Sequence, residues 1–284
     1  MINRNISKKI LHWYDNNKRS LPWRKPTSKK RKQYFTLISE FMLQQTQVKT
    51  VIPYFNNFVK KIPNLKNLAN VKETKLMQCW QGLGYYSRAR NLKKTAKKII
   101  LDFNGDLPSS IEELKSLPGI GDYTSTAIMA IAFNKPIIPL DGNVERVLKR
   151  VLYLRKENEI TKENIISKKI FFGSSNRASD YAQAIMEIGA LVCKPNKPIC
   201  IKCPISSNCI SFKKNDFIIK TKNKFNKTKY FEAQIYQNND KYLLVKNDKF
   251  NFLKNMPFFP MNEVEKKKYK YSNSKKINIK LSNM

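Results

Sequence analysis

The spacing of apolar residues predicts helices over about the first 200 residues of the chain. In segments 36–60 and 87–103, apolar positions recur every three or four residues, and the second segment sets them against a basic face. Ser109, with Glu112 three positions later, has the spacing of a capping box, which marks the start of a helix. No sustained strand alternation interrupts the pattern, so we predict an all-α fold class. Further helices are expected at residues 109–117, 122–133, 143–154, 162–172 and 177–192.

The pattern changes near residue 222. Residues 231–237 and 241–247 resemble the two strands of a hairpin around the polar turn Asn238–Asp240. All eight glycines lie closer to the N-terminus, and the end of the chain is basic and low in complexity. Residues 222–284 are therefore expected to form either a short, incomplete β-rich unit or a partly disordered tail.

Lysine and arginine number 55 against 21 aspartate and glutamate residues, which gives the 284-residue chain a formal net charge of +34. Such a charge indicates a polyanionic partner, either nucleic acid or an acidic membrane. The abundance of Lys, Asn and Ile also fits a biased base composition, so charge alone leaves both explanations open. No apolar run is long enough to span a membrane, and the first residues do not form a secretory signal. We therefore expect a cytosolic protein.

Side chains able to hold a metal are concentrated in one loop. His12 is the only histidine, so histidine triads and two-histidine metal sites are excluded. Cys193, Cys200, Cys203 and Cys209 follow the spacing C-x6-C-x2-C-x5-C. In a reducing cytosol such a cluster binds a metal more readily than it forms disulfides. Four thiolates can hold Zn²⁺ or a [4Fe–4S] cluster; the wide first spacing favours the iron–sulfur cluster, with zinc as the alternative.

A glycine-containing turn joins two of the expected helices at residues 117–121, which read Leu-Pro-Gly-Ile-Gly. Gly119 and Gly121 allow a sharp turn and a close approach of the backbone to a ligand. The N–H groups that follow can bind a phosphate oxygen at the start of a helix. The turn, with Leu117 at its start, is therefore predicted to grip a DNA backbone without reading sequence. An ordinary turn between helices is the alternative.

Five blocks of sequence resemble one family of helix–hairpin–helix DNA glycosylases that carry an iron–sulfur loop. The family is that of the adenine DNA glycosylases, called MutY, which remove adenine mispaired with 8-oxoguanine. The resemblance covers about residues 6–212. The blocks are ISEFMLQQTQV (38–48), WQGLGYYSRARNL (80–92), LPGIGDYTSTAI (117–128), PLDGNVERVL (139–148) and MEIGALVC (186–193).

The resemblance implies a two-lobed enzyme with DNA across the cleft between the lobes. A short remnant of a Nudix-like domain would follow the catalytic region. The implied divisions are 1–221 for the catalytic region, 31–133 for its helix–hairpin–helix lobe, 1–30 with 134–221 for its cluster lobe, and 222–284 for the remnant.

Two carboxylates match the catalytic positions of the family. Glu40 matches the catalytic acid, and its apolar neighbours would raise its pKa so that it can protonate a purine ring nitrogen. Asp141 matches the carboxylate that stabilises the oxocarbenium character of the sugar. It could also cap the helix that follows it. Asn143 is expected to orient this site. A solvated surface glutamate is the alternative for Glu40.

Tyr123 separates the family from its endonuclease III-like sister branch. That branch acts on oxidised pyrimidines and places a lysine here, whose amine forms a Schiff base and adds lyase activity. With Tyr123 the implied enzyme is monofunctional and uses water. The alternatives are a pyrimidine-lesion glycosylase/lyase and a non-catalytic DNA-binding protein with a four-cysteine zinc loop.

Further positions match the family's contacts with DNA and with the flipped base. Gln45 and Tyr85 would wedge into the base stack, with core packing as the alternative for Tyr85. Arg88 and Arg146 are expected either to contact phosphates or to order the site. The adenine pocket is expected to consist of Leu21, Trp23, Arg24 and Glu187.

The end of the chain resembles the part of the family that checks the base opposite adenine. Tyr271 and Ser272 match an aromatic-serine-histidine loop that senses 8-oxoguanine, with Asn273 in place of the histidine. The resemblance thus implies a monomer that binds double-stranded DNA with A:8-oxoguanine or A:G mispairs and has no membrane partner.

Overall fold

The computed structural model describes residues 5–154, 176–217, 229–250, 252, 254 and 256–265. The chain divides into two compact units, Met1–Lys220 (the helical unit) and Thr221–Met284 (the C-terminal unit). The expected helix at 162–172 and the residues Tyr271 and Ser272 lie outside the described residues. Within the described ranges, no helix is both long and apolar enough to cross a bilayer.

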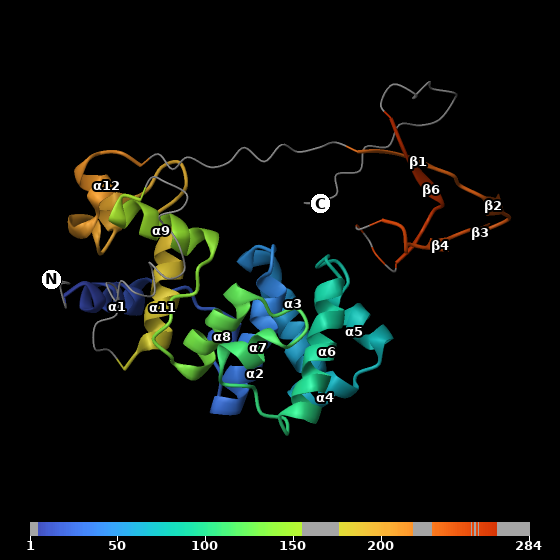
Figure 1. Cartoon of the computed structure of the whole chain (residues 1–284), viewed down its shortest axis with the longest axis horizontal. Helices are drawn as coiled ribbons and strands as arrows, with labels where there is room; N and C mark the ends of the chain where they lie inside the picture. Colours follow the sequence, from blue (N-terminus) through green and yellow to red (C-terminus); the bar gives the residue numbers. More distant parts are fainter. Residues whose placement is uncertain are drawn as a thin grey trace. The chain divides into compact units, whose positions relative to one another are not determined.

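The helical unit consists of helices joined by turns and loops (Figure 1). Its elements are α1 (Asn5–Asn17), η1 (Pro22–Arg24), α2 (Lys29–Leu43), α3 (Val48–Lys61), α4 (Leu65–Asn70), α5 (Glu73–Trp80), α6 (Ser87–Asp102), α7 (Ile111–Lys115), α8 (Asp122–Phe133), α9 (Gly142–Leu152), α11 (Ala178–Glu187), η3 (Ile188–Val192), η4 (Cys200–Lys202), η5 (Ser206–Asn208) and α12 (Ile210–Lys213).

Most expected helices are confirmed, but the single helix over 36–60 is wrong. The structure has α2 and α3 in its place, separated by a turn. Gln45 lies in this turn with a φ of 55°, a left-handed conformation that ends a helix. Apolar spacing runs through the break because both helices bury one face in the same core.

The start of α7 lies one residue later than expected. Ser110, and not Ser109, is the N-cap, and its Oγ accepts a hydrogen bond from the backbone N–H of Glu113 at 3.2 Å. The same hydroxyl donates to Oε2 of Glu113 at 2.8 Å. A serine with a glutamate three residues later therefore does start the helix, but the pair lies one residue closer to the C-terminus than expected.

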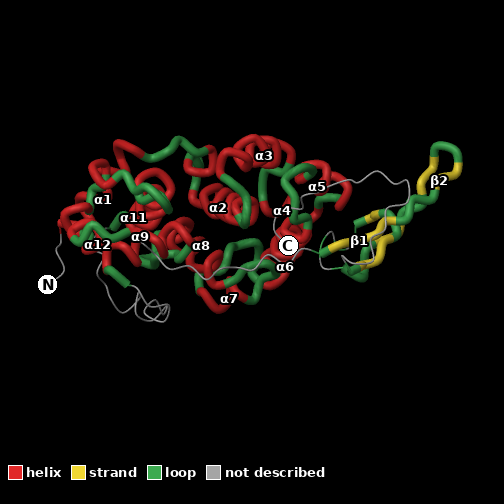
Figure 2. The backbone as a smooth tube through the Cα atoms, turned by 90° about the horizontal axis from the view of Figure 1, so that it is seen from above, coloured by secondary structure: helices red, strands yellow, loops and turns green. Residues whose placement is uncertain are grey.

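Two hydrophobic cores form two lobes within the helical unit, which confirms the two-lobed all-α prediction. One core contains Phe41, Phe55 and Trp80 and is built from α2 to α8. The other contains Tyr14 and Leu148 and is built from α1, α9, α11 and the cysteine loop. Helix α8 packs against both α2 and α11, so it joins the lobes (Figure 2).

The C-terminal unit contains short antiparallel strand pairs in its described part. β2 and β3 form the expected tight hairpin, with Asn238 opposite Lys241. The residues before this hairpin pair elsewhere, because β1 pairs with β6 instead of with residues 241–247. The strands are β1 (Tyr230–Ala233), β2 (Gln237–Asn238), β3 (Lys241–Tyr242), β4 (Val245–Lys246), β5 (Pro257–Phe258) and β6 (Met261–Val264).

Candidate active site

Glu40 is a buried carboxyl group near the C-terminal end of α2. It is 5% exposed and lies between the fully buried residues Ile38 and Phe41. Burial raises its pKa to about 7, the hydroxyl of Tyr123 lowers this pKa by donating a hydrogen bond, and the charge of Asp141 raises it. Its Oε2 has no hydrogen-bond partner among the described residues.

This environment suits a carboxyl group that carries a proton near neutral pH. A carboxyl with a pKa of about 7 is about half protonated at pH 7. An unpartnered polar atom in a protein interior is uncommon and calls for an explanation. For Glu40, the free Oε2 is an atom that can donate a proton to a base brought into the site.

Asp141 lies at the other side of the site as the N-cap of α9. Its Oδ1 accepts a hydrogen bond from the backbone N–H of Val144 at 2.6 Å, and its Oδ2 accepts one from Nδ2 of Asn143 at 3.2 Å. The capping role and the catalytic position therefore coexist in one carboxylate. Asp141 lies close enough to Glu40 and Tyr123 for its charge to raise the pKa of both groups. The structure therefore brings these three side chains together.

Asn143 connects Asp141 to the cysteine loop through Arg146. Oδ1 of Asn143 accepts a hydrogen bond from Arg146 at 2.8 Å. Arg146 also donates to the carbonyl oxygens of Cys193 at 2.8 Å and Gly189 at 2.7 Å. A Cβ at Gly189 would lie 2.7 Å from the Cβ of Asn143, so this close packing of η3 on α9 requires glycine. Of the two expected roles of Arg146, ordering the site matches these contacts.

The carboxylate of Glu187 is fully buried and bound by two arginines. Arg24 donates from Nη2 at 2.8 Å. Arg19 binds it with two nitrogens, Nε to Oε2 at 2.8 Å and Nη2 to Oε1 at 2.9 Å. Sequence reasoning missed Arg19, although it lies two residues before Leu21. The available signal was that the expected pocket contains Glu187 with a single arginine, whereas a buried carboxylate needs more hydrogen bonds than one partner supplies.

The other expected pocket residues lie at the joint between the lobes. Leu21 is buried, and Trp23 packs edge-on against Phe55 of the first core, with ring centroids 5.4 Å apart. Arg24, one residue later, donates from Nε to Gln183 of α11 at 2.8 Å. The short helix η1 thus brings an aromatic ring and a guanidinium group to the boundary of the two cores.

The turn at 117–121 lies beside the helix that carries Glu40. Gly119 has a φ of +83°, and a Cβ there would lie 2.9 Å from both Phe41 and Asn91. Its carbonyl accepts a hydrogen bond from Gln44 at 3.2 Å. Gly121 is the exposed N-cap of α8, and a Cβ there would meet no other part of the chain within 4 Å. Leu117 is only 2% exposed, and its backbone N–H and carbonyl are both hydrogen-bonded within the turn, so it anchors the turn and offers no contact to a ligand.

Gln45 and Tyr85 lie in two loops that adopt left-handed backbone conformations, with φ of 55° and 47°. Arg88 lies behind both loops and is 6% exposed. Its guanidinium donates to backbone carbonyls, including that of Met42 at 2.8 Å and that of Gly84 at 3.1 Å. Of the two expected roles of Arg88, ordering the site matches this geometry, and a phosphate contact does not.

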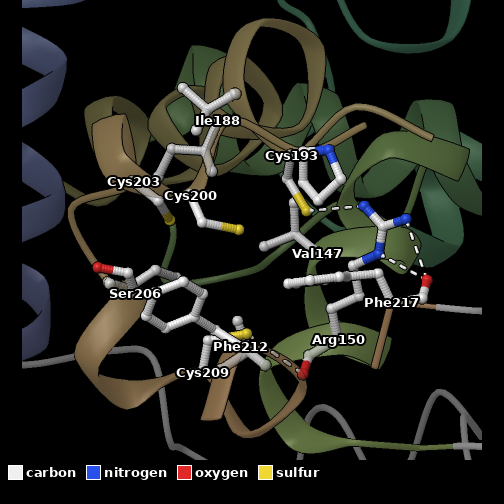
Figure 3. A pocket seen from close by; sticks show the side chains of 14 residues that line it. Val147, Arg150, Ile188, Cys193, Cys200, Cys203, Ser206, Cys209, Phe212 and Phe217 are labelled. Carbon is white, nitrogen blue, oxygen red and sulfur yellow. Dashed lines mark hydrogen bonds between the residues drawn. The ribbon is translucent and has the colours of Figure 1, made fainter. Parts of the chain in front are cut away.

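The four clustered cysteines line one pocket in the second lobe (Figure 3). The remaining wall is largely apolar and includes Val147, Ile188 and Ile205. Burial raises the pKa of the Cys203 thiol to about 11. Arg150 approaches Sγ of Cys193 with Nη1 at 3.5 Å. By contrast, the fifth cysteine, Cys79, is buried in the first core.

The four thiols form one set of sulfur donors in this pocket. Within the described ranges, no three His, Cys, Asp or Glu side chains converge closely enough to hold a metal ion. Figure 3 shows the four cysteine side chains around one pocket, and four thiolates can hold either an iron–sulfur cluster or a zinc ion.

Comparison with known proteins identifies the class. Residues 38–170 match the family model of the HhH-GPD superfamily base excision DNA repair proteins. A solved thermostable thymine-DNA glycosylase has a TM-score of 0.64 at 26% identity, covering 74% of this chain and 97% of its own. Endonuclease III in a non-covalent DNA complex has the same fold, with a TM-score of 0.58 at 24% identity over 76% of this chain and 99% of its own. A base-excision DNA glycosylase is the class that this fold and site define.

Curated relatives narrow the class to one family. The adenine DNA glycosylase of Buchnera aphidicola subsp. Schizaphis graminum is 36% identical over 96% of this chain and 80% of its own length. The human adenine DNA glycosylase is 41% identical over 70% of this chain, but the match covers 38% of the human protein. The chain belongs to the adenine DNA glycosylase family, and it is an adenine-specific DNA glycosylase that binds DNA.

Proposed function

We propose that the enzyme hydrolyses the N-glycosidic bond of adenine opposite 8-oxoguanine or guanine in double-stranded DNA. The observation that carries the mechanism is Glu40, a buried carboxyl with a pKa of about 7 and an unpartnered oxygen, close to the charge of Asp141. Glu40 is suited to donate a proton, and Asp141 is suited to stabilise a positive charge that develops on the sugar.

In the proposed reaction, Glu40 donates its proton to a ring nitrogen of the extruded adenine. The glycosidic electron pair leaves with the base, which departs neutral, and the sugar acquires oxocarbenium character. Asp141, fixed by Val144 and Asn143, stabilises that charge. Water then adds to the sugar carbon and loses a proton. Tyr123 orients Glu40 and supplies no amine, so we expect a monofunctional enzyme.

We further propose that the pocket residues Leu21, Trp23, Arg24 and Glu187, with Arg19, receive the extruded adenine. The ring of Trp23 and the polar edge formed by the arginine–glutamate cluster support this proposal. Gln45 and Tyr85 would fill the gap in the base stack, because they lie on adjoining loops held by one guanidinium group. The open backbone at Gly121 suits a DNA phosphate.

Single-turnover excision tests the reaction. Wild-type enzyme should release adenine from A:8-oxoguanine and A:G duplexes. Glu40→Gln should bind the same duplexes but cut them at least about 100-fold more slowly, the usual contribution of a general acid. Retained cleavage would remove Glu40 from the acid role. Borohydride should trap no covalent enzyme–DNA adduct, and efficient trapping would contradict the monofunctional mechanism.

We propose that Cys193, Cys200, Cys203 and Cys209 hold a [4Fe–4S] cluster. Four thiols in one largely apolar pocket support this proposal, with zinc as the alternative. When bound, such a group fixes the loop that Arg146 joins to Asn143; it takes no part in cutting the glycosidic bond. The purified protein should be brown with broad visible absorption, and Cys203→Ser should bleach it. A colourless protein with one zinc per chain would contradict this proposal.

A further inference from the structure

We propose that Arg88 is a positioning residue that locks the two wedge loops, 44–47 and 82–85, to each other and to the helix that carries Glu40. The inference rests on the proposed wedging roles of Gln45 and Tyr85. It makes Arg88 the residue on which the extrusion of adenine from the duplex depends, with no contact to DNA itself.

The hydrogen bonds of Arg88 reach all three parts. Nη1 donates to the carbonyl oxygens of Phe41 at 3.2 Å and Met42 at 2.8 Å, in the last turn of α2, and to that of Gln44. Nη2 donates to the carbonyl oxygens of Leu83 at 3.3 Å and Gly84 at 3.1 Å. The guanidinium therefore binds the residue immediately before each wedge residue.

The wedge residues need this support because neither loop adopts a relaxed backbone. Gln45 and Tyr85 both have positive φ, a region that disfavours residues with a Cβ. Such conformations persist only where the surroundings hold them. Arg88 supplies hydrogen bonds on the N-terminal side of both residues, and its guanidinium carbon lies 5.3 Å from the centroid of the Tyr85 ring.

The charge of Arg88 makes this connection costly to break. The side chain is buried, and none of the described acidic residues forms an ion pair with it. Burial lowers its pKa to about 10. Carbonyl oxygens and the rings of Trp80 and Tyr85 compensate the charge. If one loop moved away, buried N–H groups would lose their acceptors, so the two loops are coupled through the guanidinium.

A lysine at position 88 cannot form the same set of hydrogen bonds. Its ammonium group is a single point with three donors, whereas the planar fork of arginine reaches acceptors on both sides. Arg88→Lys therefore keeps the charge and should keep the fold, but should release one of the loops. Arg90→Lys is the matched control, because Arg90 lies on the same helix and pairs with Glu73 at the surface.

Base extrusion is measured directly with 2-aminopurine in place of the target adenine, opposite 8-oxoguanine, in a Glu40→Gln background that does not cut. The fluorescence of 2-aminopurine rises when it leaves the stack. Arg88→Lys should reduce this rise and, with Glu40 intact, slow adenine excision by about 10–100-fold, the usual effect of misplacing a positioning group. The pH dependence of excision should keep its midpoint near 7, because Glu40 is unaltered. Arg90→Lys should change neither readout.

Two further measurements separate this role from other roles. If Arg88 acts through the wedge residues, Arg88→Lys should slow excision little further in an enzyme that already carries Gln45→Ala and Tyr85→Ala. If the rate reductions from the two sets of substitutions multiply instead, the proposal is overturned. If Arg88 contacted a phosphate, removing its charge would lower the salt dependence of DNA binding by about one ion, and that result would also overturn the proposal.

A second variant tests the same connection if Arg88→Lys does not fold. Gly84 has a φ of +75° and open space around a Cβ, so Gly84→Ala displaces an acceptor carbonyl without a clash. It should lower extrusion, whereas Gly105→Ala, at a φ of +81° away from the loops, should not. If wild-type enzyme fails to excise adenine, the proposed function fails; if it succeeds and the variants extrude normally, only the role of Arg88 fails.

Discussion

At the scale of residues, Glu40 and Asp141 have similar chemistry in contrasting surroundings. Glu40 has one hydrogen bond from Tyr123 and one oxygen without a partner among the described residues. Both oxygens of Asp141 accept hydrogen bonds, from Val144 and Asn143. Separate environments let two carboxyl groups perform opposite tasks, one as an acid and one as an anion.

The raised pKa of Glu40 predicts a pH-dependent cost to stability. Its folded-state pKa of about 7 lies above the unfolded value of 4.5. The contribution of Glu40 to the free energy of unfolding is therefore most favourable below pH 4.5, and this contribution is lost as pH rises through 7. Glu40→Gln removes the effect and should gain about 3 kcal/mol over wild type between pH 4.5 and 8. Urea unfolding at several pH values measures this difference, and a constant difference would contradict it.

At the scale of elements, sequence spacing predicts α6 and α9 because each buries one apolar face in a core. It predicts no break at residues 44–47, since the apolar period continues across it. At the break, Arg88 donates hydrogen bonds to the end of α2, although it lies more than 40 residues away in the sequence. Local patterns contain no information on such a distant hydrogen bond. The pairing of β1 with β6 was missed for the same reason.

The helix–hairpin–helix turn predicts a specific cost for Gly119→Ala. The positive φ and the two contacts at 2.9 Å leave no room for a methyl group. We expect a loss of about 1–3 kcal/mol in the free energy of unfolding and weaker binding to any DNA duplex. Thermal unfolding and fluorescence anisotropy measure both effects. Gly105→Ala is the control for the cost of a positive φ without a clash, since only the flexible end of the Ile100 side chain lies near the added methyl group. Equal losses in the two variants would show that the contacts with Phe41 and Asn91 are not limiting.

At the scale of the whole molecule, the excess of positive charge is shared by both units. Residues 222–284 contain 15 lysines against five acidic residues, so a substantial part of the net charge lies outside the unit that contains Glu40 and Asp141. Counterion release makes DNA affinity fall as salt rises, in proportion to the phosphates that cations neutralise. If the charge is functional, it strengthens binding to any DNA duplex, and selectivity for adenine then depends on the proposed site.

Removal of residues 222–284 tests whether the C-terminal unit contributes charge alone or also reads the opposite base. The helical unit contains its own cores and the residues proposed for catalysis, so the shortened enzyme should still excise adenine under single-turnover conditions. Its DNA affinity should fall, with a shallower dependence on salt. The match to the Buchnera enzyme extends over 96% of the chain and so includes this unit. We therefore expect the ratio of excision rates for A:8-oxoguanine over A:G to fall as well. An unchanged ratio with a shallower salt dependence would show that the C-terminal unit acts through its lysines alone.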